Sequence, residues 1–109
     1  MKLIRSVIHP DKVEAVKAAL SKLDVLWLTV TQVCDHNPQK THTMVWRGHR
    51  FEIGATRLEI DAAVHDDDVD QVVDVIIKSA RTGELDDGYV SVIPVEHRYE
   101  IRTGRRAVS

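Results

Sequence analysis

The sequence has few cysteines and no long apolar run, and both shortages exclude classes of protein. A single cysteine, Cys34, cannot form an internal disulfide framework, and it suits a reducing cytoplasm. No apolar run approaches the roughly 20 residues of a membrane-spanning helix, and the first residues lack the charged and then apolar layout of a signal peptide. We therefore expect a cytoplasmic protein that does not insert directly into a membrane.

A surplus of positive charge is also missing. The 109 residues include 15 Lys and Arg against 17 Asp and Glu, which gives a formal net charge of −2 and a pI near 6.3. Binding to a phosphate backbone requires basic residues in surplus, and the one dense basic cluster is 102–106, so we expect no nucleic-acid partner. The apolar fraction of 43% is sufficient for one modest core, and residues 1–109 are predicted to form a single domain.

Apolar periodicity predicts four strands and two helices. Apolar residues alternate along four stretches, which we predict to be strands: 2–8, 25–33, 58–64 and 89–95. Pro10 suits the first turn of a helix, and apolar residues three and four positions apart predict helices over 10–23 and 69–80. The three aspartates 66–68 precede the second helix, and we interpret them as capping and dipole-compensating residues rather than as metal ligands.

The order of these elements predicts the fold class. Strand, helix, strand, strand, helix and strand form the α+β ferredoxin-like arrangement, βαββαβ, in which an antiparallel sheet carries both helices on one face. The second face of the sheet would then have no cover. Because alternate apolar side chains would be exposed there, we expect the chain to close this face by forming an oligomer.

The long polar segment 35–56, between the second and third predicted strands, is the predicted working part of the chain. It contains three of the six histidines and three Lys or Arg residues, and it has no sustained helix or strand period. A loop longer than about 15 residues in a compact domain is usually either functional or disordered. Its aromatic residues, Trp46 and Phe51, are predicted to form a partner surface.

Six motifs make the chain resemble the PII family of signal-transduction proteins. They occur in the family's order and with almost no change of length: MKLIRSVIHPDKVEAVKAAL at 1–20, TVTQV at 29–33, QKTHT at 39–43, WRG at 46–48, ARTGELDDG at 80–88 and IRTG at 101–104. The resemblance covers nearly the whole chain and implies the fold predicted above. It also implies a cytoplasmic homotrimer that controls a membrane transporter or an enzyme through a T-loop, here 35–56, with a C-terminal tail at 97–109.

The resemblance further implies an adenine-nucleotide cleft between subunits. Residues at or beside its cofactor-binding positions are Thr29, Gln39, Arg57, Asp61, Thr82, Gly88 and Arg102. Gln39 matches a glutamine that helps to hold magnesium and an oxoacid, and Arg57 stands where the family has an oxoacid-contacting lysine. Arg47 matches a loop arginine that regulators of ammonium channels insert into the channel mouth, which adds it to the predicted partner-binding residues.

Departures from the family's pattern lie at the implied phosphate site. Glycines and phosphate-contacting cations are replaced at six positions: Asp35, Asn37, Pro38, Asp86, Tyr89 and Glu100. Three positive charges are lost and three negative charges are gained. One negative charge within about 5 Å of a phosphate costs on the order of several kcal/mol at an effective dielectric constant near 20. We therefore expect ADP or AMP rather than ATP as the cofactor.

Two other interpretations remain open. Cys34 and the three loop histidines gather ligands suited to zinc, nickel or copper, with His36 and His42 as candidate metal ligands of a metal-responsive accessory to a metal transport system. No tight two-cysteine or HxxxH pattern supports that metal site. An enzyme would need a nucleophile with a base in reach, or opposed carboxylates in a cleft, and neither pattern is recognisable, so we predict no catalytic residue and no enzyme.

Overall fold

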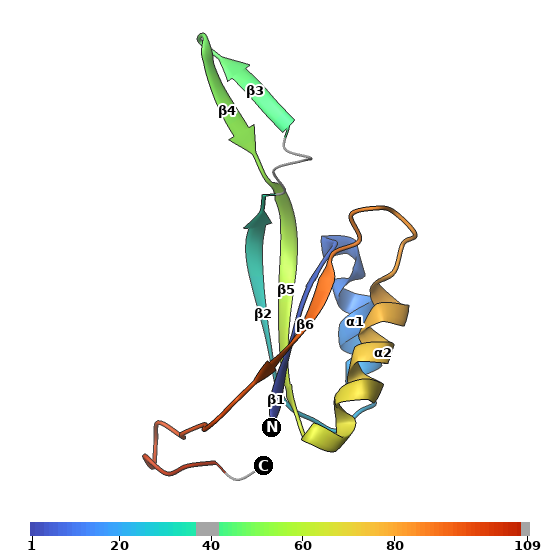
Figure 1. The fold of residues 1–109 in the computed structure, drawn as a ribbon, viewed down its shortest axis with the longest axis vertical. Coiled ribbons are helices and arrows are strands. Elements are labelled where there is room, and N and C mark those ends of the chain that lie inside the picture. Colours follow the sequence, from blue (N-terminus) through green and yellow to red (C-terminus); the bar gives the residue numbers. More distant parts are fainter. Residues whose placement is uncertain (37–41, 108–109) are drawn as a thin grey trace.

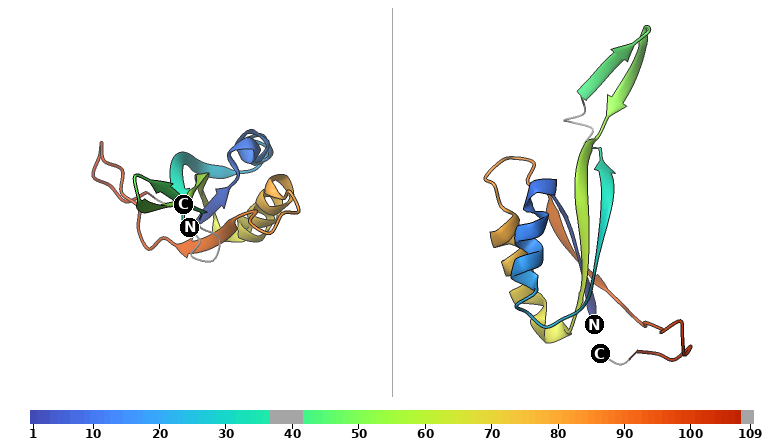
Figure 2. Two further views of the ribbon diagram at one scale, coloured as in Figure 1. Left: turned by 90° about the horizontal axis from the view of Figure 1, so that it is seen from above. Right: turned by 180° about the vertical axis from the view of Figure 1, so that it is seen from behind.

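The computed structural model describes residues 1–36 and 42–107 (Figure 1). Its main sheet has the strand order β2-β5-β1-β6, and every neighbouring pair is antiparallel. The four strands are β1 (Lys2–Ile8), β2 (Val25–Asp35), β5 (Ala55–Val64) and β6 (Tyr89–Pro94). Both helices, α1 (Val13–Leu20) and α2 (Val69–Ala80), lie on one face of this sheet (Figure 2). The predicted βαββαβ fold is confirmed.

The core lies between the helices and one face of the sheet. Alternate residues of β1 and β5, including Ile4 and Ile60, point toward the helices and are fully buried. Val16 of α1 and Ile76 of α2 meet them from the other side and are also fully buried. The apolar residues of each helix, three and four positions apart, therefore form the side that packs on the sheet.

The first helix is shorter than the predicted range 10–23. It opens as a 3₁₀ turn, η1 (Pro10–Lys12), and α1 ends at Leu20. Beyond that point the backbone N–H of Leu23 donates to the carbonyl of Leu20, at 3.0 Å, in a tight turn that leads into β2. Leu23 packs against the core from this turn, so it is apolar at a position that also fits the helical spacing. Periodicity alone could not distinguish a helical residue from a turn residue at this position.

The prediction of capping aspartates was wrong in its detail. Residues 66–68 form a second 3₁₀ turn, η2 (Asp66–Asp68), and no side chain there makes a cap hydrogen bond. Asp66 Oδ1 instead lies 2.9 Å from the amino nitrogen of Met1, and the hydrogen bond from that amino group is the main cause that lowers the pKa of Asp66. The acidic residues do stand in the first turn, where the helix dipole favours negative charge.

The segment 35–56 contains two strands that its sequence did not reveal. β3 (His42–Trp46) and β4 (His49–Ile53) form an antiparallel hairpin beyond the ends of β2 and β5, which themselves extend further than predicted (Figure 1). Arg47 and Gly48 form its two-residue turn and both have positive φ, at 50° and 78°. Positive φ at both central residues matches the twist of the flanking strands, so the hairpin closes tightly.

Exposed apolar side chains of the main sheet lie on its two edge strands. Leu26 and Val30 are exposed on β2, and Tyr89 and Val92 are exposed on β6. On the face away from the helices, the central strands carry Arg5 and other charged residues. Within the main sheet, the large exposed apolar side chains therefore lie at the edges rather than across the open face.

Candidate functional site

The turn that follows α2, residues 82–88, is organised by one carboxylate, and we call it the acidic turn. Asp87 Oδ2 accepts hydrogen bonds from the backbone N–H groups of Thr82 and Gly83, both at 2.9 Å. Asp87 also accepts a hydrogen bond from the Thr82 hydroxyl. The hydroxyl bond is the main cause that lowers the pKa of Asp87, and the two backbone donors add to it. The Asp87 carboxylate therefore occupies the hydrogen-bond donors of the turn, which would otherwise be available to an external anion.

Gly88 fixes the acidic turn against β1. Its φ is +106°, and a Cβ atom at this position would lie 1.8 Å from the carbonyl oxygen of Val7. The approach of the two backbones is too close for any side chain, and the φ value favours glycine as well. Gly88 is therefore required by packing, whatever role the cofactor prediction gives it.

An ion pair connects the acidic turn to the base of the long loop. Arg57, near the start of β5, places its Nη2 atom 3.2 Å from Asp86 Oδ2, and its Nη1 donates to the carbonyl of Thr56 at 3.3 Å. His9 Nε2 lies 3.6 Å from Asp87 Oδ1 on the other side of the turn and has no hydrogen-bond partner in the described part of the chain. Arg57 and His9 therefore each lie beside a carboxylate of the acidic turn.

A second charged group lies in the middle of the sheet, on the face without helices. Cross-strand register places Thr29 of β2, Asp61 of β5 and Arg5 of β1 in one row. Arg5 donates from Nε and Nη2 to the two carboxylate oxygens of Asp61, at 3.1 and 3.2 Å, and its Nε lies 3.4 Å from Glu59. The hydrogen bond to Asp61 is the main cause that raises the pKa of Arg5. Asp61 is thus held by a bidentate pair.

The remaining predicted cofactor residues are not brought together within one chain. Arg102 belongs to the tail, where its Nη2 atom lies 3.3 Å from Glu100, and Figure 1 shows the tail at the opposite end of the sheet from the acidic turn. Gln39 lies outside the described residues. Arg57 contacts Asp86 of the acidic turn, and Thr82 belongs to the same turn, whereas Thr29 and Asp61 form the separate row on the sheet.

Sequence reasoning missed a contact between the tail and β2. The Arg98 guanidinium carbon lies 3.7 Å from the centre of the Trp27 ring, a cation–π contact that holds the start of the tail against the edge strand. The two residues are separated by most of the chain. The one signal in the sequence was that arginine and tryptophan are residue types that can form a cation–π pair.

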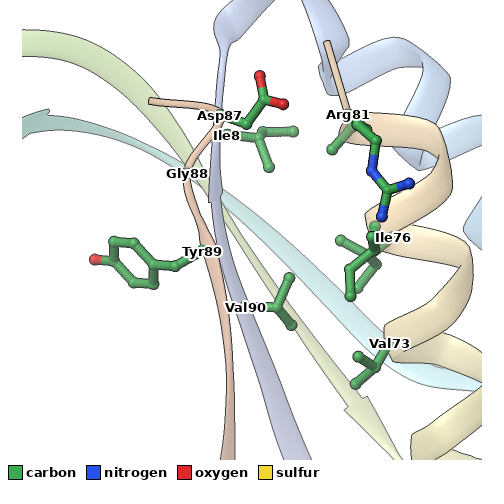
Figure 3. Close-up of a pocket in the computed structure, with 10 residues that line it drawn as sticks. Ile8, Val73, Ile76, Arg81, Asp87, Gly88, Tyr89 and Val90 are labelled. Carbon is green, nitrogen blue, oxygen red and sulfur yellow. The ribbon is translucent and has the colours of Figure 1, made fainter. Parts of the chain in front are cut away.

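A cavity of about 320 Å³ lies between α2 and β6 (Figure 3). Its walls are apolar and include Ile76 of α2 and Val90 of β6, while Arg81 and Asp87 lie at one end and the Tyr89 ring points away from α2. Of the predicted cofactor residues that the structure describes, only Gly88 lines this cavity. The cavity therefore does not gather the predicted cofactor residues within one chain.

The predicted partner residues belong to the hairpin. Arg47 stands exposed in the turn at its tip, and Trp46 and Phe51 belong to β3 and β4. No helix in the described part of the chain is long and apolar enough to cross a membrane.

The candidate metal ligands are only partly brought together. A Cβ atom placed on Gly54 would lie 2.7 Å from Cys34 Sγ and 2.8 Å from His36 Nδ1, so these two atoms converge at the base of the loop. His42 lies in β3, which follows residues 37–41, outside the described part of the chain. Within residues 1–36 and 42–107, no group of three or more His, Cys, Asp or Glu side chains is placed to hold a metal ion.

Comparison with known proteins decides the family. The sequence model of the family described as nitrogen regulatory protein P-II matches residues 1–105. This chain belongs to the P-II family. Nitrogen regulatory protein GlnK of Escherichia coli (strain K12) is 38% identical over 105 residues, which cover 95% of this chain and 94% of that protein. Nitrogen regulatory protein P-II of Rhizobium etli is 37% identical over 105 residues, with the same coverage, and that of Microchaete diplosiphon is 38% identical over 107 residues, covering 97% of this chain and 96% of the relative.

Membership of the P-II family confirms the resemblance that the six motifs indicated. It also confirms the prediction of a signalling regulator rather than an enzyme. The matching relatives are regulatory proteins, and the match covers nearly their whole length. The roles of individual cofactor, partner and metal residues stay predictions.

Proposed function

We propose that this P-II protein is a cytoplasmic homotrimer that reads an adenine nucleotide and controls a membrane transporter or an enzyme through the segment 35–56. The observation that carries the proposal is the ion pair between Arg57 and Asp86, which joins the base of this segment to the acidic turn. A ligand held near the acidic turn would therefore act directly on the loop. The hairpin extends the loop away from the sheet, which suits contact with a partner (Figure 1).

The charges around the acidic turn favour a nucleotide with few phosphates. Asp87 already accepts the hydrogen bonds of Thr82 and Gly83, so these donors are taken. Asp86 adds a carboxylate that is half exposed. A triphosphate would have to approach both carboxylates, and repulsion between like charges about 5 Å apart costs on the order of several kcal/mol at an effective dielectric constant near 20. ADP or AMP would meet less of this repulsion than ATP.

A metal-responsive accessory protein is the second candidate function. The convergence of Cys34 Sγ and His36 Nδ1 near Gly54 supports it, because thiolate and imidazole are the ligands that zinc and copper prefer. Two ligands leave a metal ion incompletely coordinated, so further ligands, with His42 as the candidate, would have to come from the loop or from another subunit.

One thermal-shift screen separates the two candidates. The chelator-treated protein is heated with AMP, ADP, ATP, zinc, nickel or copper, because a ligand that binds only the folded state raises Tm with its occupancy. We expect AMP or ADP to raise Tm more than ATP at equal concentration. Stabilisation by metal alone, lost in both His36→Ala and His42→Ala, would favour the metal-responsive protein, and strongest stabilisation by ATP would contradict the proposed phosphate preference.

A further inference from the structure

Arg57 is a charged side chain with very little access to water. Only 12% of its side chain is exposed, whereas Asp86, its partner, is 52% exposed. A guanidinium on a mostly covered side chain loses part of its hydration, and an anionic partner compensates for that loss. Among the described residues, Asp86 is the one carboxylate within ion-pair distance of Arg57. The guanidinium also donates to the neutral carbonyl of Thr56.

The two partners come from separate elements. Arg57 lies near the start of β5, directly beyond the long loop, and Asp86 lies 29 positions further along the chain in the acidic turn. The acidic turn has internal support, because Asp87 accepts hydrogen bonds from its first residues and Gly88 packs closely against Val7. Asp86 is thus presented to Arg57 by a turn with its own hydrogen bonds.

From this geometry we infer that Asp86 is a built-in ligand of the Arg57 anion site. The Asp86 carboxylate occupies the position that an external carboxylate or phosphate would need in order to reach the guanidinium. Asp86 therefore determines specificity: an anionic effector has to displace it, while an effector that is neutral at this point does not. The inference deepens the proposed function, on which it rests for the importance of Arg57, but its test involves no nucleotide.

The test is chemical rescue of the missing carboxylate by acetate. Asp86→Ala removes the internal ligand and leaves the guanidinium in place, so we expect Tm to fall by roughly 4–8 °C. Acetate should restore a large part of this loss when compared with chloride at equal ionic strength and pH 7, because it can enter the space that the carboxylate leaves. The wild-type protein should show no such difference between acetate and chloride.

Glu84→Ala is the matched control. It removes the same charge from the same turn, and none of the described contacts of Arg57 involves Glu84. We expect Glu84→Ala to behave as the wild-type protein does in both salts. An equal response to acetate in the wild-type, Glu84→Ala and Asp86→Ala proteins would overturn the inference, as would an Asp86→Ala protein with unchanged Tm.

A second variant keeps the test decisive if Asp86→Ala does not fold. The double variant Arg57→Gln, Asp86→Ala removes the unpaired cation, so it should be more stable than Asp86→Ala and should lose the response to acetate. A double variant as unstable as Asp86→Ala would show that the carboxylate has a role unrelated to Arg57. Because nucleotide affinity enters none of these measurements, failure here leaves the proposed nucleotide preference standing, and failure of that preference leaves this inference standing.

Discussion

Single residues at the acidic turn combine a structural role with a position implied in binding. Gly88 is the clearest case, since the resemblance places it beside a nucleotide while the structure places its Cα against the Val7 carbonyl. Loss of ligand binding in a Gly88 variant would therefore say little about contact with the ligand. Stability is the property through which this residue should be tested.

We expect Gly88→Ala to destabilise the protein by on the order of 3 kcal/mol. Two costs combine: a backbone conformation that L residues rarely adopt, at φ +106°, and a Cβ position 1.8 Å from a carbonyl oxygen. Gly83→Ala is the control, because Gly83 also has positive φ, +91°, but has nothing within 4 Å of its Cβ position. Urea unfolding of both variants gives the comparison, and equal losses would show that the close approach to Val7 contributes nothing.

Arg57 and Asp86 show what single-residue inference from sequence can and cannot reach. The replacement of a glycine by Asp86 was visible in the sequence, and so was the arginine at position 57. Their pairing was not, because nothing local relates residues that are 29 positions apart. The pairing of Arg5 with Asp61, across 56 positions, was hidden for the same reason, although each residue lay on a correctly predicted strand.

At the scale of elements, periodicity predicted what packing on the core requires. β1 and α2 were predicted to the residue, because their apolar residues meet one continuous core, whereas β5 begins three residues before its predicted start. The hairpin of β3 and β4 was missed, since two five-residue strands that extend beyond the main sheet have no core to impose alternation on their sequence. At Leu23 the error was the opposite one: the helix was predicted too long, because an apolar residue in the following turn fits the helical spacing.

The acidic turn should make stability depend on pH in the acidic range. Hydrogen bonds from the Thr82 hydroxyl and from two backbone N–H groups lower the pKa of Asp87 below its ordinary value of 3.8. A carboxylate with a lower pKa in the folded state stabilises the protein above the unfolded-state pKa, and this contribution is lost as pH falls through the folded-state value. We therefore expect wild-type Tm to exceed that of Asp87→Asn at pH 7, and the difference to shrink steadily below about pH 4.

Asp67→Asn serves as the comparison for this pH series. Asp67 is an exposed aspartate in η2, away from the acidic turn, so its replacement should leave the dependence of Tm on pH close to that of the wild-type protein. The Thr82→Val variant should reproduce part of the Asp87→Asn effect, since it removes the hydroxyl donor and keeps both backbone donors. A difference between wild-type and Asp87→Asn that stays constant down to pH 2 would contradict this account.

For the whole molecule, the position of the exposed apolar side chains bears on how copies assemble. Those of the main sheet lie on both of its edges, with Leu26 and Val30 on β2 and Tyr89 and Val92 on β6. In an assembly with a two-fold axis, one edge would pack against the same edge of a second copy, and the other edge would stay exposed. A head-to-tail contact covers β2 of one copy with the β6 side of the next, and it closes into a ring when the rotation permits.

We therefore expect a head-to-tail ring whose contacts require both edges, and we take the number of copies, three, from the resemblance to the family. Val30→Lys and Val92→Lys place a charge on opposite edges of the sheet, at side chains that are 40% and 47% exposed in the single chain, so each should disturb assembly far more than folding.

Leu85→Lys is the control, because Leu85 is 96% exposed in the acidic turn and belongs to neither edge. In sedimentation equilibrium the wild-type and Leu85→Lys proteins should show three times the chain mass of 12.3 kDa, and both edge variants should shift toward single chains. Assembly that depends on one edge and not on the other would exclude the head-to-tail arrangement, because each contact in such a ring buries one edge of each kind.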